Sequence, residues 1–213
     1  MSHHDQAAMP TSPAQFRFPD RLRLKPSFDP GRLSDDLERL RDAVWTGHFV
    51  QQNYDGDWSA IALRAPRDAT HPIKMIYADP AAEDFIDTPL MGCTPYFREV
   101  LAALDCPLRS VRLMRLGPGS VIKEHRDGDL AFERGAVRMH LPITTSADVD
   151  FMLNGKRVVM APGSLWYLRL SDRHSVHNRS PHERVHLVID AVANDWLAML
   201  FDDAAKDQTE YIC

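Results

Sequence analysis

Two histidines and one aspartate have the residue types and the spacing that suit a metal centre. His125 and Asp127 are separated by one residue, and His174 follows well downstream. In a β-strand, residues i and i+2 point to the same face, so we expect the imidazole and the carboxylate to converge on one point. Two histidines and one carboxylate, with further positions open, are typical of non-haem Fe(II) sites. Zinc enzymes more often leave one position open.

The His-x-Asp pair alone is weak evidence, because a solvated loop with a capping aspartate gives the same pattern. The downstream segment adds His177, which would face away from His174 in a strand, and His182, which follows a proline and is expected in solvent. Asp129 is another carboxylate in reach, but it follows a glycine turn. His125, Asp127 and His174 therefore remain the predicted ligands.

Arg184 is the second unusual residue, because it begins the apolar run RVHLVID. Burying a guanidinium without a partner is costly, so this residue requires an anion. Arginine also makes planar two-pronged bonds to carboxylates, which lysine does not reproduce. A dicarboxylate cofactor would supply the anion. His186 shares the face of Arg184 and is expected to line the same pocket, with core packing as the alternative.

The second half of the chain has the alternation and the turn signals of short strands. We expect strands over residues 108–116, 137–144, 165–170, 175–178 and 184–191. Asn154-Gly155 joins two further apolar runs, and this dipeptide favours a type I′ hairpin turn. A terminal helix is expected over residues 195–201.

The first half is mixed. Apolar residues at helical spacing predict an amphipathic helix over residues 32–44, with Ser34 as its cap. A second helix is expected over residues 94–104, capped by Thr94, and a short strand over residues 58–63.

Three arginines are candidates for contact with a substrate. Arg64 and Arg67 lie in proline-rich loops, for which a solvated basic loop is the alternative interpretation. Arg115 is predicted on a central strand, where it would either reach a substrate or pair with an internal acid.

Six or more short strands, with turn signals at roughly 8–12-residue spacing, indicate a sandwich or a barrel. We therefore expect a mainly β fold of two facing sheets, a jelly roll, with flanking helices that are mostly N-terminal. A chain of 213 residues suits one such domain. We expect residues 1–20, which have no apolar signal segment, to be a flexible leader and residues 21–213 to form the domain.

The net charge of −5 gives no general attraction to nucleic acid or to an anionic membrane. The cysteines Cys93, Cys106 and Cys213 form no CxxC pair, so we expect reduced thiols in a cytoplasmic protein. No apolar run approaches the ~20 residues that a membrane helix needs. Neither nucleic acid nor membrane is therefore expected as a partner.

From about Leu108 to Leu197 the chain resembles the aspartyl/asparaginyl β-hydroxylase family of 2-oxoglutarate oxygenases, which is related to proline hydroxylases. The motifs that carry the resemblance are RLxRLxPGSxIxxHRD at 112–127, VRMHLPI at 137–143, PGSLWYL at 162–168 and HSVHNxSxxxRVHLVID at 174–190. Together these motifs are specific, whereas none is specific alone. The resemblance implies a double-stranded β-helix, the jelly-roll or cupin-like architecture, which agrees with the strand pattern.

By this resemblance, His125, Asp127 and His174 match the iron ligands of the proline-hydroxylase-like members. The animal members have no carboxylate at the position of Asp127. They also have a cofactor-binding serine at the position of Met114, which methionine does not replace.

The resemblance also implies a 2-oxoglutarate site. Arg184 matches the arginine that binds the distal carboxylate of 2-oxoglutarate. Arg138 and His140 match an Arg-x-His pair near the proximal end of that cofactor, and their i and i+2 positions place them on one strand face.

The implied activity is Fe(II)- and 2-oxoglutarate-dependent hydroxylation of an unactivated C–H bond, with O2 as co-substrate. The expected substrate is an amino acid or an aspartyl, asparaginyl or prolyl residue, free, within a peptide or in a carrier-bound precursor. Two alternatives stay open. A cupin-like metal dioxygenase or isomerase would not need Arg184, and a non-catalytic β-sandwich binding module would tolerate the loss of a metal ligand.

Overall fold

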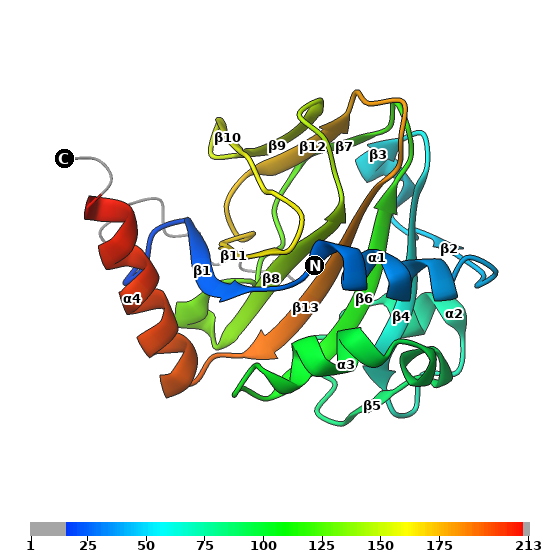
Figure 1. The fold of residues 1–213 in the computed structure, drawn as a ribbon, viewed down its shortest axis with the longest axis horizontal. Coiled ribbons are helices and arrows are strands. Elements are labelled where there is room, and N and C mark those ends of the chain that lie inside the picture. Colours follow the sequence, from blue (N-terminus) through cyan, green and yellow to red (C-terminus); the bar gives the residue numbers. More distant parts are fainter. Residues whose placement is uncertain (1–15, 211–213) are drawn as a thin grey trace, which may run out of the picture.

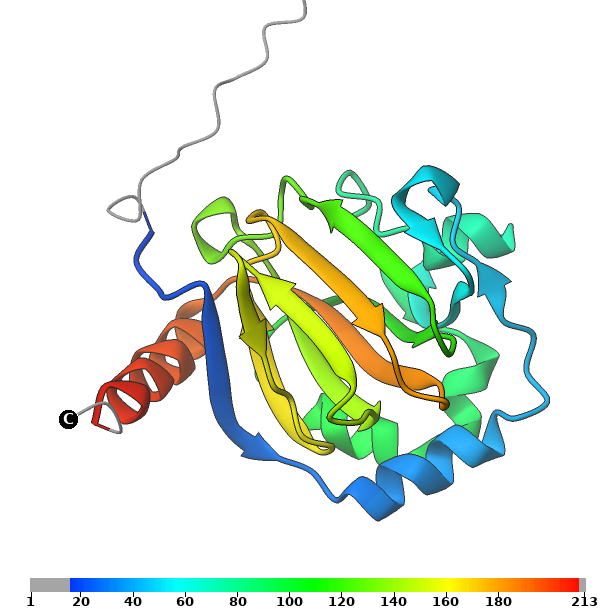
Figure 2. The same ribbon diagram turned by 90° about the horizontal axis from the view of Figure 1, so that it is seen from above.

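Two antiparallel β-sheets face each other in the computed structural model, which describes residues 16–210 (Figures 1 and 2). The strands of the larger sheet are β1 (Arg21–Ser27), β2 (Thr46–Gly47), β4 (Trp58–Pro66), β5 (Phe85–Asp87), β6 (Leu108–Leu116), β8 (Ala136–Thr144), β11 (Ser164–Leu168) and β13 (Arg184–Val192). Their order is β1-β11-β8-β13-β6-β4-β2, with β5 paired to β4. The strands of the smaller sheet are β3 (Tyr54–Asp55), β7 (Val121–His125), β9 (Val149–Leu153), β10 (Lys156–Val158) and β12 (His174–Asn178). Their order is β10-β9-β12-β7-β3.

The longer helices lie on the outer side of the larger sheet. Figure 1 shows α1 (Pro30–Arg39) and α3 (Pro95–Ala102) in front of this sheet, and α4 (Asp195–Glu210) beside β1. The shorter helices are α2 (Pro72–Ile76), η2 (Gln51–Asn53), η3 (Pro89–Cys93) and η4 (Phe132–Arg134). The larger sheet is therefore covered by helices on one face and by the smaller sheet on the other.

Alternate residues of the larger sheet face two different cores. On β6, Val111 and Leu113 belong to the core under the helices, whereas Met114 belongs to the core between the sheets. Arg112 shares the face of Met114, because residues i and i+2 of a strand point the same way. Polar residues on this inner face of β6, β8 and β13 therefore point into an enclosed space.

Most strand predictions for the second half are confirmed closely, although the strand expected over 165–170 ends at Leu168 as β11. The strand expected over 108–116 has the bounds of β6, and those over 137–144 and 184–191 each gain one residue in β8 and β13. The hairpin between β9 and β10 turns at Asn154 and Gly155, whose φ angles are 49° and 71°. Two positive φ angles are what a type I′ turn requires.

The predicted N-terminal helix starts earlier than expected, and its predicted cap is wrong. The carboxylate of Asp29 accepts hydrogen bonds from the backbone N–H groups of Gly31, at 2.8 Å, and Arg32, at 3.1 Å. Asp29 therefore has the capping role predicted for Ser34. The helix also ends at Arg39, short of the expected residue 44.

The second predicted helix is present as α3, but the side chain of Thr94 does not cap it. Instead, the buried carboxylate of Asp36 in α1 accepts a hydrogen bond of 2.8 Å from the backbone N–H of Phe97. One helix thus caps another. The terminal helix α4 continues past the expected end at residue 201 to Glu210.

The two facing sheets confirm the predicted double-stranded β-helix. Residues 1–15 of the predicted leader, and Cys213, lie outside the described residues, whereas Phe18 is buried. Cys93 and Cys106 are free thiols. Among residues 16–210 no helix has the length and apolar character needed to span a membrane.

Candidate active site

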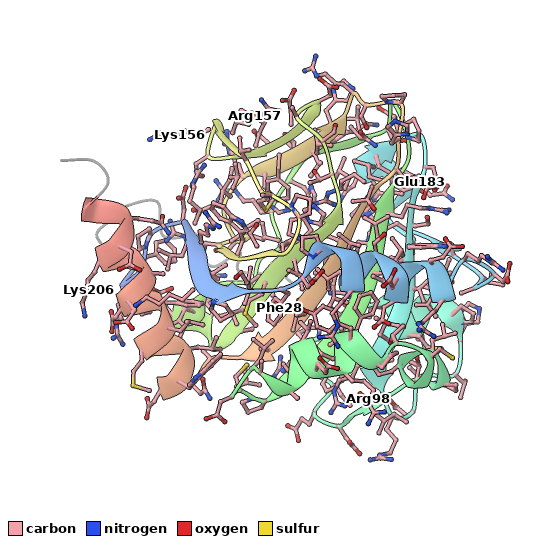
Figure 3. The ribbon with its side chains drawn as sticks, viewed as in Figure 1. Phe28, Arg98, Lys156, Arg157, Glu183 and Lys206 are labelled. Carbon is pink, nitrogen blue, oxygen red and sulfur yellow. The ribbon has the colours of Figure 1, made fainter. Side chains whose placement is uncertain are left out.

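A cavity of about 350 Å³ lies between the two sheets. Its walls include Arg138 and His140 of β8 and His174 of β12. By contrast, Figure 3 shows the labelled side chains of Arg98 on α3 and Lys206 on α4 extending outward from the ribbon. Arg138, His140 and His174 therefore face the space between the sheets, unlike Arg98 and Lys206.

The structure brings the three predicted metal ligands together. One ligand atom each from His125, Asp127 and His174 lies within 4.8 Å of the other two. His125, the last residue of β7, pairs in register with His174, the first residue of β12, and their ring centroids are 4.3 Å apart. The strand argument for Asp127 is wrong in detail, because β7 ends at His125. Asp127 is instead anchored in a loop by its backbone N–H, which donates to the carbonyl of Leu170 at 2.8 Å.

Backbone carbonyls orient both imidazoles. Nδ1 of His125 lies 2.8 Å from the carbonyl oxygen of Lys123, and Nδ1 of His174 lies 3.0 Å from that of Asp172. A carbonyl only accepts, so Nδ1 donates, and in the neutral imidazole Nε2 then keeps the lone pair that binds a metal. Burial lowers the pKa of His174 to about 4, which keeps its imidazole neutral, as metal binding requires.

A chain of ion pairs leads from the partly exposed Asp127 to the buried inner wall of the larger sheet. Nη1 of Arg138 donates to Oδ2 of Asp127 at 2.7 Å, while its Nε and Nη2 donate to Asp190 at 2.6 and 3.0 Å. Nη2 of Arg112 donates to the same Asp190 at 2.5 Å. Although burial favours the neutral acid, Arg138 and Arg112 hold the pKa of Asp190 below its usual value.

Arg184 is buried, as predicted, and lines the cavity. Its Nη2 donates to Nδ1 of His186 at 2.9 Å, and its Nε has no hydrogen-bond partner. Among the described residues no carboxylate forms an ion pair with it, and burial lowers the pKa of Arg184 to about 9. The guanidinium thus has the unmet need for an anion that the sequence indicates.

His140 and His186 lie beside this guanidinium in different ways. Nδ1 of His186 is 3.4 Å from Nδ1 of His140, and Nε2 of His140 is buried without a partner. His140 lines the cavity, whereas His186 is not among its lining residues. Burial lowers the pKa of both histidines well below 6.5. His186 therefore contacts the guanidinium as a hydrogen-bond acceptor and does not face the cavity.

The profile of the family described as Aspartyl/Asparaginyl beta-hydroxylase matches residues 32–194. The match includes all of the cavity-lining residues named so far. The chain belongs to the aspartyl/asparaginyl β-hydroxylase family.

One relative of this family member is L-proline cis-4-hydroxylase of Rhizobium meliloti (strain 1021), which is 29% identical over 168 residues. The alignment covers 78% of this chain and 58% of that protein. The chain thus spans less than two thirds of the length of this relative.

Two solved structures of proteins from nogalamycin biosynthesis resemble this member of the aspartyl/asparaginyl β-hydroxylase family. The non-haem α-ketoglutarate-dependent carbocyclase SnoK aligns with a TM-score of 0.54 at 8% identity, over 83% of this chain and 81% of SnoK. The α-ketoglutarate-dependent epimerase SnoN aligns with a TM-score of 0.51 at 11% identity, over 83% and 79%. At identities this low the likeness shows the shared fold.

The three arginines considered for substrate contact do not line the cavity of this β-hydroxylase family member. Arg115 lies on the opposite face of β6 from Met114, with Nε donating to Ser59 at 3.1 Å. Arg64 pairs with Asp87 at 2.7 Å, and Arg67 pairs with Asp84 at 2.5 Å. Arg115 pairs with two acids, Asp57 and Glu183, which also do not line the cavity.

Arg112 and Asp190 are site residues that the sequence reasoning missed. The signal was nevertheless available, because residues an even number of positions apart on a strand point to the same face. By this rule Asp190 lies on the face of Arg184, and Arg112 lies on the face of Met114. What the sequence does not supply is the register that sets Asp190 directly opposite Arg138 across β13 and β8.

An aromatic group at another wall of the cavity was also missed. The ring of His48 stacks on that of Trp58 with centroids 3.5 Å apart, and burial lowers the pKa of His48 to about 4. Phe49 and Tyr77 extend this wall, and their ring centroids are 5.4 Å apart. Both side chains are partly exposed. In the aspartyl/asparaginyl β-hydroxylase motifs quoted above, no residue indicates this wall.

Proposed function

We propose that this chain is an Fe(II)- and 2-oxoglutarate-dependent hydroxylase. The observation that carries the proposal is Arg184, a buried guanidinium without a carboxylate partner among the described residues, in one cavity with a His-Asp-His group. A stable core would avoid an uncompensated buried charge, because such a charge costs several kcal/mol. A diacid that binds both the metal and Arg184 would compensate it.

The residues present fit this pair of ligands. His125, Asp127 and His174 would supply two neutral imidazoles and one carboxylate, the donor set of open Fe(II) sites. Arg184 would bind the distal carboxylate of 2-oxoglutarate through charge-assisted hydrogen bonds. His140, whose buried Nε2 has no partner, lines the same cavity.

Bound iron and 2-oxoglutarate would supply the oxidising power, with O2 and 2-oxoglutarate giving succinate and CO2 while one oxygen atom enters a substrate C–H bond. The chain's own contribution is binding and orientation. The carbonyls of Lys123 and Asp172 fix the imidazoles, and the two sheets enclose the space in which the substrate is held.

We propose an amino acid as the substrate, or an aspartyl, asparaginyl or prolyl residue in a peptide or carrier-bound precursor. The family description and the L-proline cis-4-hydroxylase of Rhizobium meliloti support this substrate class. The aromatic wall of His48 and Trp58 gives the cavity an apolar surface for a ring or a methylene group.

The test is formation of succinate by the purified chain with Fe(II), 2-oxoglutarate and O2, first alone and then with free proline, aspartate, asparagine and peptides that contain them. We expect succinate in amounts that depend on Fe(II) and rise with the true substrate. Asp127→Ala and His174→Ala should abolish it. The matched control is His177→Ala on the same strand, whose side chain faces away from the cavity and which should retain activity.

The alternatives predict different outcomes. A chain that binds Fe(II) but forms no succinate with any of these compounds would favour a cupin-like metal enzyme without 2-oxoglutarate. A chain that binds no metal would favour a non-catalytic binding module.

A further inference from the structure

Asp190 is a buried carboxylate at the wall of the cavity, and the proposed metal and cofactor set does not include it. It lies on β13, directly opposite Arg138 on β8. Both of its oxygens are used, because Arg138 binds Oδ1 and Oδ2, and Arg112 binds Oδ2 as well. One acid therefore fixes two arginines of the cavity.

Arg138 extends this arrangement to Asp127. With Nε and Nη2 directed to Asp190, the guanidinium presents Nη1 to Oδ2 of Asp127 at 2.7 Å. The other oxygen, Oδ1, is not bound by Arg138 and lies 3.6 Å from Nε2 of His125. The two oxygens of Asp127 thus have different environments, because Oδ2 is bound by the guanidinium and Oδ1 lies toward His125.

We propose that Asp190 is a positioning residue that acts through Arg138 to present only Oδ1 of Asp127 to the metal. The inference rests on the proposed function, because it assumes that Asp127 is a metal ligand. Its effect is to make Asp127 a ligand through one oxygen and to keep the remaining positions of the metal open.

The need for such a device follows from where Asp127 lies. The residue is beyond the end of β7, and its side chain is 30% exposed, so strand geometry does not fix its rotamer. Without Asp190, the planar guanidinium of Arg138 would be free to bind both oxygens of Asp127, which is the favoured geometry for an arginine–carboxylate pair. That bidentate pair would compete with the metal for Oδ1.

The experiment measures binding of Co(II), which does not drive oxygen chemistry here, to the metal-free chain of 213 residues by calorimetry and by visible absorption. Asp190→Asn should weaken the affinity about ten- to one-hundred-fold, the usual effect of removing a group that orients a metal ligand. The matched control is Asp36→Asn, which neutralises another buried carboxylate far from the cavity and retains an oxygen acceptor for Phe97. It should leave the affinity within about two-fold of the wild type.

A second variant separates positioning from simple charge. Asp190→Asn also leaves Arg112 and Arg138 without their anion, and two uncompensated cations repel a divalent ion. Arg138→Gln removes a positive charge and also frees both oxygens of Asp127. Charge alone would tighten Co(II) binding and leave the visible spectrum of bound Co(II) as in the wild type, whereas loss of positioning would change that spectrum, because Asp127 could then bind through both oxygens. We expect a changed spectrum, and an unchanged spectrum in Arg138→Gln would overturn the inference, whether or not Asp190→Asn folds.

The outcomes also distinguish this inference from the proposed function. If the wild type binds Co(II), and Asp127→Ala does not, the metal site stands. Unchanged affinity in folded Asp190→Asn then overturns the positioning role alone. If the wild type binds no Co(II), the proposed function and this inference fail together.

Discussion

Arg184 is hard to explain by stability, because its buried guanidinium has a histidine as its hydrogen-bond partner and, among the described residues, no acid. We predict that Arg184→Met raises the free energy of unfolding of the ligand-free chain by ~1–3 kcal/mol, since a costly buried charge is removed. The same change should weaken 2-oxoglutarate binding to the Co(II)-loaded protein about ten- to one-hundred-fold, because a charge-assisted pair is lost. Urea unfolding and calorimetric titration measure the two effects.

Arg169 provides the matched control for this prediction. It is also a buried arginine, but its Nη2 pairs with Asp172 at 2.8 Å and its Nη1 donates to the carbonyl of Phe18 at 3.0 Å. Arg169→Met should therefore destabilise the chain. If Arg184→Met destabilises the chain equally, Arg184 has a structural role and is not an anion-binding residue.

His186 and His140 make stability depend on pH in a predictable direction. Burial lowers the pKa of each well below 6.5, so below about pH 6.5 the unfolded chain binds protons that the folded chain does not. Their contribution to stability is therefore present above pH 6.5 and is lost as the pH falls. For each histidine that stays neutral in the folded chain, the free energy of unfolding should fall by up to about 1.4 kcal/mol for each pH unit below pH 6.5.

Urea unfolding of the metal-free chain between about pH 7.5 and 5.5 tests this assignment. His186→Asn removes one titrating group and retains an acceptor for Arg184, so it should make the loss of stability with acid shallower. His182→Asn, at an exposed histidine, controls for removing a histidine as such. An equal pH dependence in the two variants would contradict the assignment to His186.

At the site, the sequence predicts what depends on residue type and local spacing. His125, His174 and Arg184 stand in motifs, and the structure gathers them in one cavity. The Arg138–Asp190 pair depends on which residues meet across two strands that are far apart in the chain. A strand's alternation shows which face a residue takes, but not its partner on the neighbouring strand.

At the scale of elements, the first helix shows how a local signal is overridden. Ser34 has the type of a cap, but Asp29 precedes Pro30, and proline fits the first helical position. We predict that Asp29→Ala lowers the free energy of unfolding by ~1 kcal/mol, because two backbone N–H groups lose their acceptor. Ser34→Ala should change it by a few tenths of a kcal/mol.

Equilibrium unfolding in urea compares these two variants directly. Equal losses from Asp29→Ala and Ser34→Ala would show that the helix start seen in the structure is wrong.

The cap of α3 could not be predicted from the sequence for a different reason. Asp36 and Phe97 are distant in the chain, and only the packing of α1 against α3 brings them into contact.

At the scale of the whole molecule, the fold was predictable because many strands carry the same signal. Alternation and turn residues repeat from Leu108 onward, so an error at one strand end leaves the architecture unchanged. The first half has fewer such repeats. Its contribution to the cavity, the wall of His48 and Trp58, depends on β4 joining the edge of β6.

The proposed ligands would connect the two sheets. His125 and His174 belong to the smaller sheet, whereas His140 and Arg184 belong to the larger one. A metal ion alone would hold residues of the smaller sheet and the following loop. A diacid bound to that metal and to Arg184 would span the space between the sheets, so its stabilising effect should require the metal.

Thermal unfolding with Co(II), with 2-oxoglutarate and with both tests this coupling. A ligand at one hundred times its Kd stabilises the folded state by about 2.7 kcal/mol, so saturating amounts give a measurable shift in Tm. We predict a small shift with 2-oxoglutarate alone, a moderate shift with Co(II), and a shift with both that exceeds their sum. Arg184→Met should retain the Co(II) shift and lose the excess. Stabilisation by 2-oxoglutarate that is equal with and without metal would place the diacid away from the His-Asp-His group.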